Sequence, residues 1–269
     1  MTRGILIFAH NSETFDYVKI ASIAARLAKK NLGLPVTLVT DADSLTSDVS
    51  VFDNLIVTEK PSTENTRVVD NKVDYFFNFN RHQAYELTPY DHTLLIDSDL
   101  LILTDRLNSY WDVNESFLIC ERMNDLVGQR LTNNEYRVGD KTIPLRWATA
   151  IMFKKDRQSK VIFNMVKKIQ KDYRYYFDLY DFKLENFRND IAFSIAAHIV
   201  KGFKDTEINL PPMLFINPNE NIFSVDNGSI RLMLDSENKK CMLSIKGADI
   251  HVMNKHDILK FEKELCLGT

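Results

Sequence analysis

The N-terminal part of the chain alternates short, nearly continuous apolar runs with one amphipathic segment. Residues 4–9 and 36–40 are the first two runs. Between them, residues 15–30 repeat polar positions at helical spacing, and Gly33 and Pro35 are placed to end a helix there. Strands that are apolar throughout are typical of a parallel sheet covered by helices on both faces. This pattern predicts an α/β protein with a mostly parallel central sheet.

The remaining elements are predicted from the same two patterns, apolar runs for strands and helical spacing of polar residues for helices. The segment 10–14, just before the first predicted helix, contains side chains of the types that cap helices. Further strands are expected at 55–57, 94–96 continuing into 100–103, 117–120, 150–153, 241–245 and 250–253, and helices at 80–87, 159–176 and 191–200. The turn residues 226–229 lie between apolar segments 223–225 and 230–234, which predicts a hairpin. We therefore expect one domain, with a nucleotide-binding half at 1–105 and an acceptor half at 106–269 whose end is smaller and β-rich.

Composition restricts the function classes. The chain has 269 residues and a formal net charge of −3, so it is not a polycation that would coat nucleic acid or an anionic membrane. Its three cysteines, Cys120, Cys241 and Cys266, have no metal-binding spacing, which predicts a reduced compartment without a zinc site or a disulfide framework. The apolar start is too short for a signal peptide, and no run approaches the roughly 18 apolar residues of a membrane span. These features predict a cytoplasmic protein.

Two aspartates at the end of an apolar run are the strongest chemical signal. Asp97, Ser98 and Asp99 follow the run 94–96, and a second apolar run follows at once. If the strand continues, residues i and i+2 point to the same face, so both carboxylates can reach one object. Like charges held this close favour a cation between them, and hard divalent cations bind both carboxylates and substrate phosphates. The alternative is an acidic turn between two short strands.

Two carboxylates do not saturate a divalent ion, so a third ligand is expected. The segment 249–256, close behind a predicted strand, contains His251 and His256, and the sequence leaves open which of them binds the ion. An imidazole ligand favours Mn²⁺ over Mg²⁺. Lys255, between them, would supply a point charge to a departing diphosphate. An ordinary charged surface loop is the alternative.

Other candidates lie at strand and helix ends, where α/β folds bind their ligands. At the ends of the first two strands stand His10, Asn11 and Asp41. Arg67 and Arg81 precede the aspartate pair, and a guanidinium suits phosphate or a base. Asn189 and Asp190 open a helix, where capping is a sufficient explanation and contact with sugar or acceptor is the functional one. Trp147 precedes a strand and is a candidate for the sugar site, with core packing as the alternative.

The segment from Lys160 to Lys183 interleaves basic residues with tyrosines. Such a pattern suits single-stranded or flipped nucleic acid, although it is more often the wet face of a helix. Known phosphate and nucleophile motifs are missing: the sequence has no phosphate-binding loop, dinucleotide fingerprint or nucleophile elbow. With only eight glycines, the chain argues against an ATPase or a dehydrogenase.

Four parts of the chain together resemble a GT-A glycosyltransferase, most closely the glycogenin-like retaining enzymes. They are the first strand, the segment around Asp97 and Asp99, the Asn189–Asp190 pair, and His251 with Lys255. In that family an Asp-x-Asp pair and a late histidine bind manganese, and a nearby lysine meets the diphosphate. The resemblance implies that Asp97, Asp99 and His251 are metal ligands, that Lys255 is the lysine, and that Asn189 and Asp190 face sugar and acceptor. The late family motif, His-Phe-x-Gly followed by Lys-Pro-Trp, reads His-Val-Met-Asn-Lys-His here.

The chain also resembles tailed-phage glycosyltransferases over nearly its full length, on the phrases Ile-Phe-Ala-His-Asn, Leu-Ile-Asp-Ser-Asp and His-Val-Met-Asn-Lys. That resemblance implies an enzyme of the host cytoplasm that moves a sugar from a nucleotide-diphosphate donor to an acceptor such as hydroxymethylcytosine in phage DNA. A UDP-sugar is the first candidate for the donor. Alternatives are a glycan- or protein-modifying glycosyltransferase, a nucleotidyltransferase, and an inactive sugar- or DNA-binding module of the same fold. The sugar and the oligomeric state are not fixed by the sequence.

Overall fold

The computed structural model describes residues 1–62, 65–69, 72–77, 79–126, 137–139, 142–182, 186–204, 209–218, 220–226, 228–236 and 239–267. Within these ranges only the backbone is described at 67–69, 72, 234–236, 239–240 and 267. Asn227 and Lys183, which belong to the predicted hairpin turn and to the basic–aromatic segment, lie outside the described residues.

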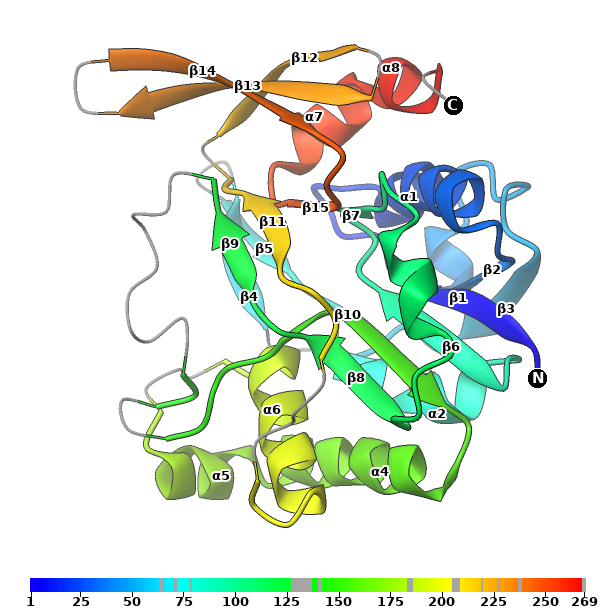
Figure 1. Cartoon of the computed structure of the whole chain (residues 1–269), viewed down its shortest axis with the longest axis vertical. Helices are drawn as coiled ribbons and strands as arrows, with labels where there is room; N and C mark the ends of the chain where they lie inside the picture. Colours follow the sequence, from blue (N-terminus) through cyan, green and yellow to red (C-terminus); the bar gives the residue numbers. More distant parts are fainter. Residues whose placement is uncertain are drawn as a thin grey trace.

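A six-stranded sheet forms the centre of the molecule (Figure 1). Its strand order is β3 (Asn54–Thr58), β2 (Val36–Asp41), β1 (Arg3–Phe8), β6 (His92–Ile96), β10 (Trp147–Lys154) and β8 (Phe117–Cys120). The first four strands are parallel, and β10 runs antiparallel to both of its neighbours. The predicted α/β class with a mainly parallel sheet is therefore confirmed.

Helices cover both faces of this sheet, because its strands are apolar on both sides. Ile5 and Ile7 of β1 pack in the cluster that includes α1 (Tyr17–Leu32), whereas Leu6 packs on the other side. That other side holds α2 (Ala84–Leu87), α4 (Arg157–Lys171), α5 (Tyr173–Tyr180) and α6 (Asn189–Val200). The result is three layers, with α1 above the sheet and α4 to α6 below it in Figure 1.

Three smaller sheets complete the fold. One has the order β7 (Leu100–Leu101), β15 (Ile250–Val252), β11 (Met213–Ile216) and β9 (Met123–Asp125). The second is the antiparallel set β12 (Asn221–Asp226), β13 (Ser229–Ser236) and β14 (Lys239–Lys246), which confirms the hairpin pairing. The third pairs β4 (Thr66–Val69) with β5 (Lys72–Tyr75). Two short helices, α7 (Lys255–Lys260) and α8 (Glu262–Leu267), follow β15.

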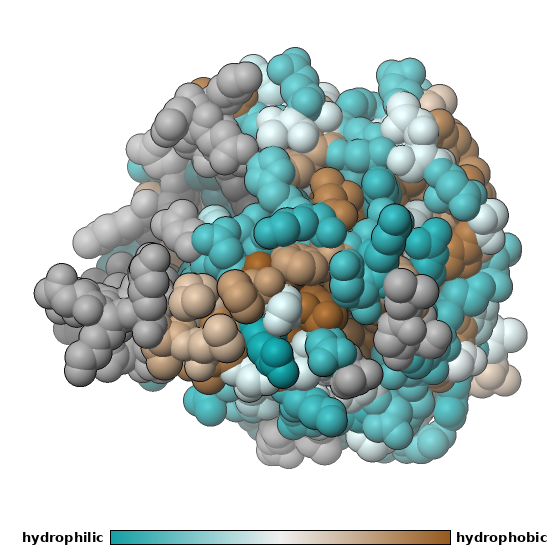
Figure 2. Space-filling view, turned by 90° about the horizontal axis from the view of Figure 1, so that it is seen from above, coloured by the Kyte–Doolittle hydropathy of each residue, from teal (hydrophilic) through white to brown (hydrophobic). Residues whose placement is uncertain are grey.

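The antiparallel C-terminal sheet lies at the top of Figure 1, above the central sheet. The face seen from above is mainly hydrophilic, with hydrophobic residues gathered near its middle and along one side (Figure 2). Phe223 and Met242 are exposed hydrophobic residues of this sheet. Among the described residues, no helix has both the length and the apolar character needed to cross a membrane.

Several predicted elements differ from the structure. The strand predicted to run through 97–99 ends at Ile96, because the chain leaves the central sheet there and at β7 joins the smaller sheet that contains β15, β11 and β9. The helix predicted at 159–176 is two helices, α4 and α5, since Asp172 has a non-helical backbone between them. The segment 80–87 begins as a 3₁₀ helix, η2 (Phe79–Gln83).

The start of α1 also differs from the prediction. Asp16 is its N-cap and accepts a hydrogen bond from the Lys19 amide, so the cap lies two residues beyond the predicted segment 10–14. Asn11 nevertheless contributes, because its Oδ1 accepts the amide hydrogen of Val18. The strands β8 and β10, which follow residue 105, belong to the same sheet as β1. The division into functional halves at that residue stays a prediction.

Candidate functional site

A cavity of about 760 Å³ opens at the carboxyl ends of β1 and β6. The sheet of β7, β15, β11 and β9, the start of α6 and the start of α7 supply its other walls. Most of the residues predicted from the sequence line it, namely His10, Arg81, Asp97, Ser98, Asp99, Trp147, Asn189, Asp190, His251 and Lys255. Residues distant in sequence therefore meet in one place, at the end of the sheet where α/β folds bind their ligands.

The two aspartates lie on a turn that is held from both sides. The Asp97 amide donates to the carbonyl of Thr149 on β10, at 3.0 Å. The carbonyl of Asp99 accepts the amide of Val252 on β15, also at 3.0 Å. The pair is thus the acidic turn that was the alternative at the sequence level, yet its carboxylates still converge because the turn bridges two sheets.

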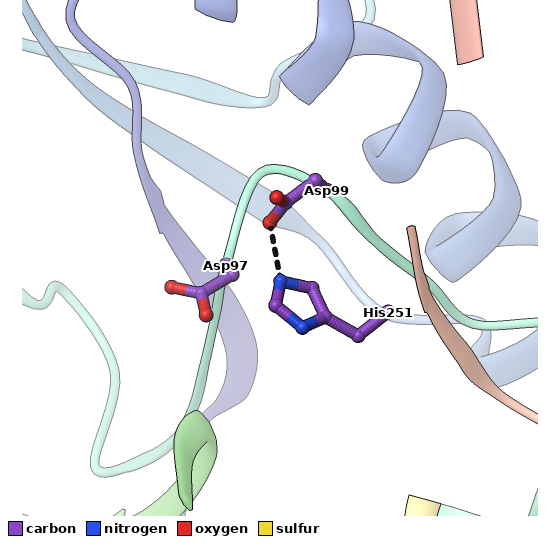
Figure 3. Close-up of side chains that lie close together, drawn as sticks. All are labelled: Asp97, Asp99 and His251. Carbon is purple, nitrogen blue, oxygen red and sulfur yellow. Dashed lines mark ion pairs between the residues drawn. The ribbon is translucent and has the colours of Figure 1, made fainter. Parts of the chain in front are cut away.

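His251 on β15 completes a cluster with the two aspartates. One potential ligand atom from each of the three side chains lies within 4.8 Å of the others. In Figure 3 the Asp99 carboxylate points toward the imidazole, and Asp97 lies on the same turn. His256 also lines the cavity, but it is not part of this cluster, and its ring packs 4.8 Å from that of Phe15.

Basic side chains contact both aspartates. Arg81 Nη1 forms an ion pair with Asp97 Oδ1. The two oxygens of Asp99 are both engaged, Oδ1 by His251 Nε2 at 3.1 Å and Oδ2 by Lys255 Nζ at 2.6 Å. Each carboxylate therefore has a positively charged side chain tethered beside it.

The two aspartates differ in acidity because their neighbours differ. Burial raises the pKa of Asp97, and the nearby charge of Asp99 adds to that rise against the opposing effect of Arg81. Burial also acts on Asp99, but its interactions with His251 and Lys255 outweigh burial and hold the pKa of that carboxyl below its ordinary value. Two buried carboxylates at this spacing gain from a divalent cation.

The donor set fits such an ion. Two carboxylates and an imidazole supply three ligand atoms, and phosphate oxygens and water complete the shell of a hard or borderline cation. The remaining ring nitrogen of His251, Nδ1, is buried and has no hydrogen-bond partner among the described residues.

Arg81 offers further donors to the cavity. Its side chain is 8% exposed, and Nε and Nη2 are buried without a hydrogen-bond partner in the described part of the chain. Unpaired buried donors are costly, so a position beside a cavity favours an anionic ligand that accepts from them. This observation supports a phosphate role for Arg81.

The start of α6 brings a third acid to the cavity. Asp190 Oδ1 accepts the amide hydrogen of Ala148, and Oδ2 pairs with Arg188 Nη2, both at 2.8 Å. Burial would raise the pKa of Asp190, but Arg188 and the Ala148 amide outweigh it and lower that pKa. Asn189 precedes Asp190 and is 6% exposed. Both residues lie in the first turn of α6, whose N-cap is Arg188.

His10 and Asp41 form a buried pair at the ends of β1 and β2. His10 Nδ1 lies 2.8 Å from Asp41 Oδ2, and Asp41 also accepts hydrogen bonds from the amide and hydroxyl of Ser44. Burial lowers the pKa of His10 more than Asp41 raises it. Asp41 is therefore placed behind His10 rather than at the cavity wall.

Asn11 is also used differently from the prediction. Its side chain bonds the Val18 amide, the Ser44 carbonyl and the Thr46 hydroxyl, and it lines a neighbouring cavity of about 480 Å³. Arg67 lies on β4, and its side chain is outside the described part of the structure.

The basic–aromatic segment does not form a stacking surface from all its rings. Tyr176 and Tyr180 are buried in the core beneath the central sheet, and the Tyr173 hydroxyl donates to the carbonyl of Asn186. Tyr175 is 63% exposed. The buried rings are unavailable to nucleic acid, because they pack the helices α4 to α6 together.

Of the aromatic residues that line the cavity wall, sequence reasoning found Trp147 and missed the others. Trp147 stacks on Phe215 with ring centroids 6.3 Å apart, and Arg188 lies 5.6 Å from the Trp147 ring centre. Tyr17, Phe76 and Phe187 also line the cavity. The missed residues come from a helix, a strand and two loops and look like ordinary core residues in the sequence, so no local signal marks them.

Comparison with known proteins identifies similar structures but no sequence relatives. No sequence model of a known protein family matches the chain, and no curated protein matches it. Similar solved structures include the galactosyltransferase LgtC in complex with donor and acceptor sugar analogues, at 14% identity and a TM-score of 0.45 over 72% of this chain and 70% of that chain.

Two further similar structures are also glycosyltransferases. Mouse xyloside xylosyltransferase 1 has 13% identity and a TM-score of 0.46, over 76% of this chain and 83% of that chain. The glycosyltransferase GlyE of Streptococcus pneumoniae TIGR4 has 12% identity and a TM-score of 0.39, over 75% of this chain and 43% of that chain. None of these TM-scores is high enough to establish a shared fold.

Proposed function

We propose that this protein is a metal-dependent glycosyltransferase of the GT-A class that transfers a sugar from a nucleotide-diphosphate donor. The observation that carries the proposal is the convergence of Asp97, Asp99 and His251 in one cavity, with Arg81 and Lys255 beside them. A divalent ion and a diphosphate are the ligands that this combination of oxygen, nitrogen and cationic groups suits best.

Asp97, Asp99 and His251 would hold the ion, Mn²⁺ in preference to Mg²⁺ because of the imidazole. When bound, the ion would act as a Lewis acid that offsets the charge developing on the leaving diphosphate. Arg81 donates from its unpaired Nε and Nη2 to a phosphate oxygen, and Lys255 supplies a mobile ammonium group. These two side chains orient the diphosphate and stabilise the charge that develops on it as the sugar is transferred.

The remaining cavity residues suit the nucleoside and the sugar. His10, held by Asp41, and Ser98 are assigned to the donor nucleotide, with UDP as its nucleotide part. Trp147 and Asn189 are assigned to the sugar. Asp190 supports these two residues. Its two oxygens are engaged by the Ala148 amide and by Arg188, so that it fixes Arg188 against Trp147. Retention of the anomeric configuration is proposed from the resemblance to glycogenin-like enzymes, and a cytoplasmic location from the cysteine pattern.

A screen of nucleotide sugars for metal-dependent hydrolysis tests this function, since slow transfer to water needs no known acceptor. We expect release of UDP from at least one UDP-sugar in the presence of Mn²⁺ and none after chelation. Thermal stabilisation by UDP with Mn²⁺, without turnover on any donor or acceptor, would instead identify an inactive binding module.

For the acceptor we propose hydroxymethylcytosine in phage DNA. The support is the sequence resemblance to phage enzymes and the aromatic wall of the cavity, on which a flipped base can stack. The test offers hydroxymethylcytosine DNA, unmodified DNA and simple glycans with labelled donor. Transfer to the modified DNA alone, falling steeply with added salt, is expected. Transfer to a glycan but to neither DNA would reject this acceptor and leave the glycosyltransferase function standing.

A further inference from the structure

Every acidic side chain that lines the described part of the cavity is paired with a basic one. The pairs are Arg81–Asp97, Lys255–Asp99 and Arg188–Asp190. No other Asp, Glu, Lys or Arg among the described lining residues contributes charge. The protein's own carboxylates and basic groups therefore balance in the cavity.

Two of these pairs involve carboxylates that are assigned to the metal. Asp99 has both oxygens engaged, because Lys255 Nζ is 2.6 Å from Oδ2 and His251 Nε2 is 3.1 Å from Oδ1. Asp97 Oδ1 is in contact with Arg81 Nη1. A cation that binds these carboxylates competes with the two basic side chains for the same oxygens. The third pair differs, because Asp190 is outside the cluster.

Both basic side chains can donate to a second anion at the cavity. Arg81 keeps Nε and Nη2 unpaired and buried while Nη1 contacts Asp97. Lys255 is the first residue of α7, and its flexible stem allows the ammonium group to turn from Asp99 to another anion. A dication brings two positive charges, and a diphosphate restores the balance by accepting hydrogen bonds from both side chains.

We propose that Arg81 and Lys255 are internal counter-ions, which pair with Asp97 and Asp99 or with a diphosphate, and thereby make metal binding and diphosphate binding depend on each other. The inference rests on the proposed function, because it takes its two ligands from there. Metal alone binds weakly since it competes with tethered cations, and diphosphate alone binds weakly since those cations are already paired. Each ligand raises the affinity for the other by the same factor.

The experiment measures Mn²⁺ binding from the loss of the free-ion electron paramagnetic resonance signal, with and without saturating UDP. The variants are Lys255→Met and Arg81→Met. Arg188→Met is the matched control, because it removes the same charge from the same cavity but from a carboxylate outside the metal cluster. This readout needs no turnover, sugar or acceptor.

In the wild-type protein we expect UDP to tighten Mn²⁺ binding by about tenfold or more. Lys255→Met and Arg81→Met should bind Mn²⁺ alone several-fold more tightly than the wild type, and the effect of UDP should shrink to about threefold or less. Arg188→Met should keep the wild-type effect of UDP. If Arg81→Met unfolds because Asp97 stays buried without a partner, Lys255→Met and Lys255→Gln decide the question.

The outcomes separate this inference from the function on which it rests. Variants that bind Mn²⁺ no more tightly than Arg188→Met, or that keep the full effect of UDP, would overturn the counter-ion role while the metal site stands. A wild-type protein that binds no Mn²⁺ with or without UDP would overturn both.

Discussion

The pKa of an acidic side chain at the cavity depends more on its neighbours than on its residue type. Asp97 and Asp99 are two positions apart, yet burial raises the pKa of the first while His251 and Lys255 lower that of the second. The sequence predicted both residues, and its resemblance to glycogenin-like enzymes implied His251 and Lys255. It could not separate His251 from His256, since that choice depends on the pairing of β15 with β7, which places His251 beside the turn at 97–99.

The third ligand is tested by comparing the two histidines. His251→Ala should weaken Mn²⁺ binding by about tenfold or more, because it removes a ligand atom from a cluster of three. His256→Ala is the matched control, since that ring lines the same cavity outside the cluster. Isothermal titration with Mn²⁺ in the presence of UDP measures both. Equal affinities for the two variants would remove His251 from the ligand set.

The role of Asp99 is tested through turnover. Asp99→Asn keeps the shape of the side chain but removes its charge, so metal-dependent hydrolysis of the donor should fall by about a hundredfold or more. Asp74→Asn provides the comparison, because Asp74 is equally buried and bonds Ser12 beside the neighbouring cavity. Near wild-type turnover of Asp99→Asn at limiting Mn²⁺ would contradict the assignment.

Helices and strands that form because of their own local sequence were predictable, whereas features that depend on contacts between distant segments were not. The strands β1, β2 and β6 and the helix α1 follow from apolar runs and from Gly33, whose φ of 69° ends the helix. The turn at 97–99 was taken for a strand, because only the pairing of β7 with β15 in a separate sheet shows that the chain changes direction. Except for Trp147, the aromatic wall was missed for the same reason, since its residues come from a helix, strands and loops that are far apart in the chain.

The strand β1 also depends on a glycine that the apolar pattern does not explain. A β-carbon at Gly4 would collide with the Tyr90 ring, which is held by a 2.8 Å hydrogen bond between its hydroxyl and Thr37. Gly4→Ala should therefore lower the free energy of unfolding by about 1–3 kcal/mol, as overpacking does. Chemical denaturation measures this value. Adding Tyr90→Leu should cost less than the sum of the two single changes; strict additivity would show that the ring is not the cause.

At the scale of the whole fold, the parallel sheet and its helical covers were predictable from the sequence, and the assembly of β7, β9, β11 and β15 into one smaller sheet was not. Those strands are short, and their pairing joins segments far apart in the chain, as β9 with β11 does. Local propensity carries little information about such partners. The cavity nevertheless lies at the strand ends that carry the candidate residues, because the ends of β1 and β6 are fixed by the central sheet.

Stability should depend on pH through His92, at the opposite end of β6 from the cavity. Its ring is 1% exposed and packs against Trp111, and burial, with Lys154 and Arg3 nearby, lowers its pKa to about 4 from 6.5. Between those values the unfolded chain binds a proton that the folded protein does not, so stability falls as pH decreases from about 6.5 to 4, by up to about 3 kcal/mol. Thermal unfolding of the wild type and His92→Phe over this range measures the effect. The same pH dependence in both proteins would assign it to other groups.

The most direct measurement is anomalous diffraction at the manganese edge from crystals grown with Mn²⁺ and UDP. We expect one strong peak bounded by Asp97, Asp99 and His251, with the diphosphate on the side of Arg81 and Lys255. A peak elsewhere in the cavity, or UDP bound with no metal between it and the two aspartates, would contradict a metal-dependent transferase built on this cluster.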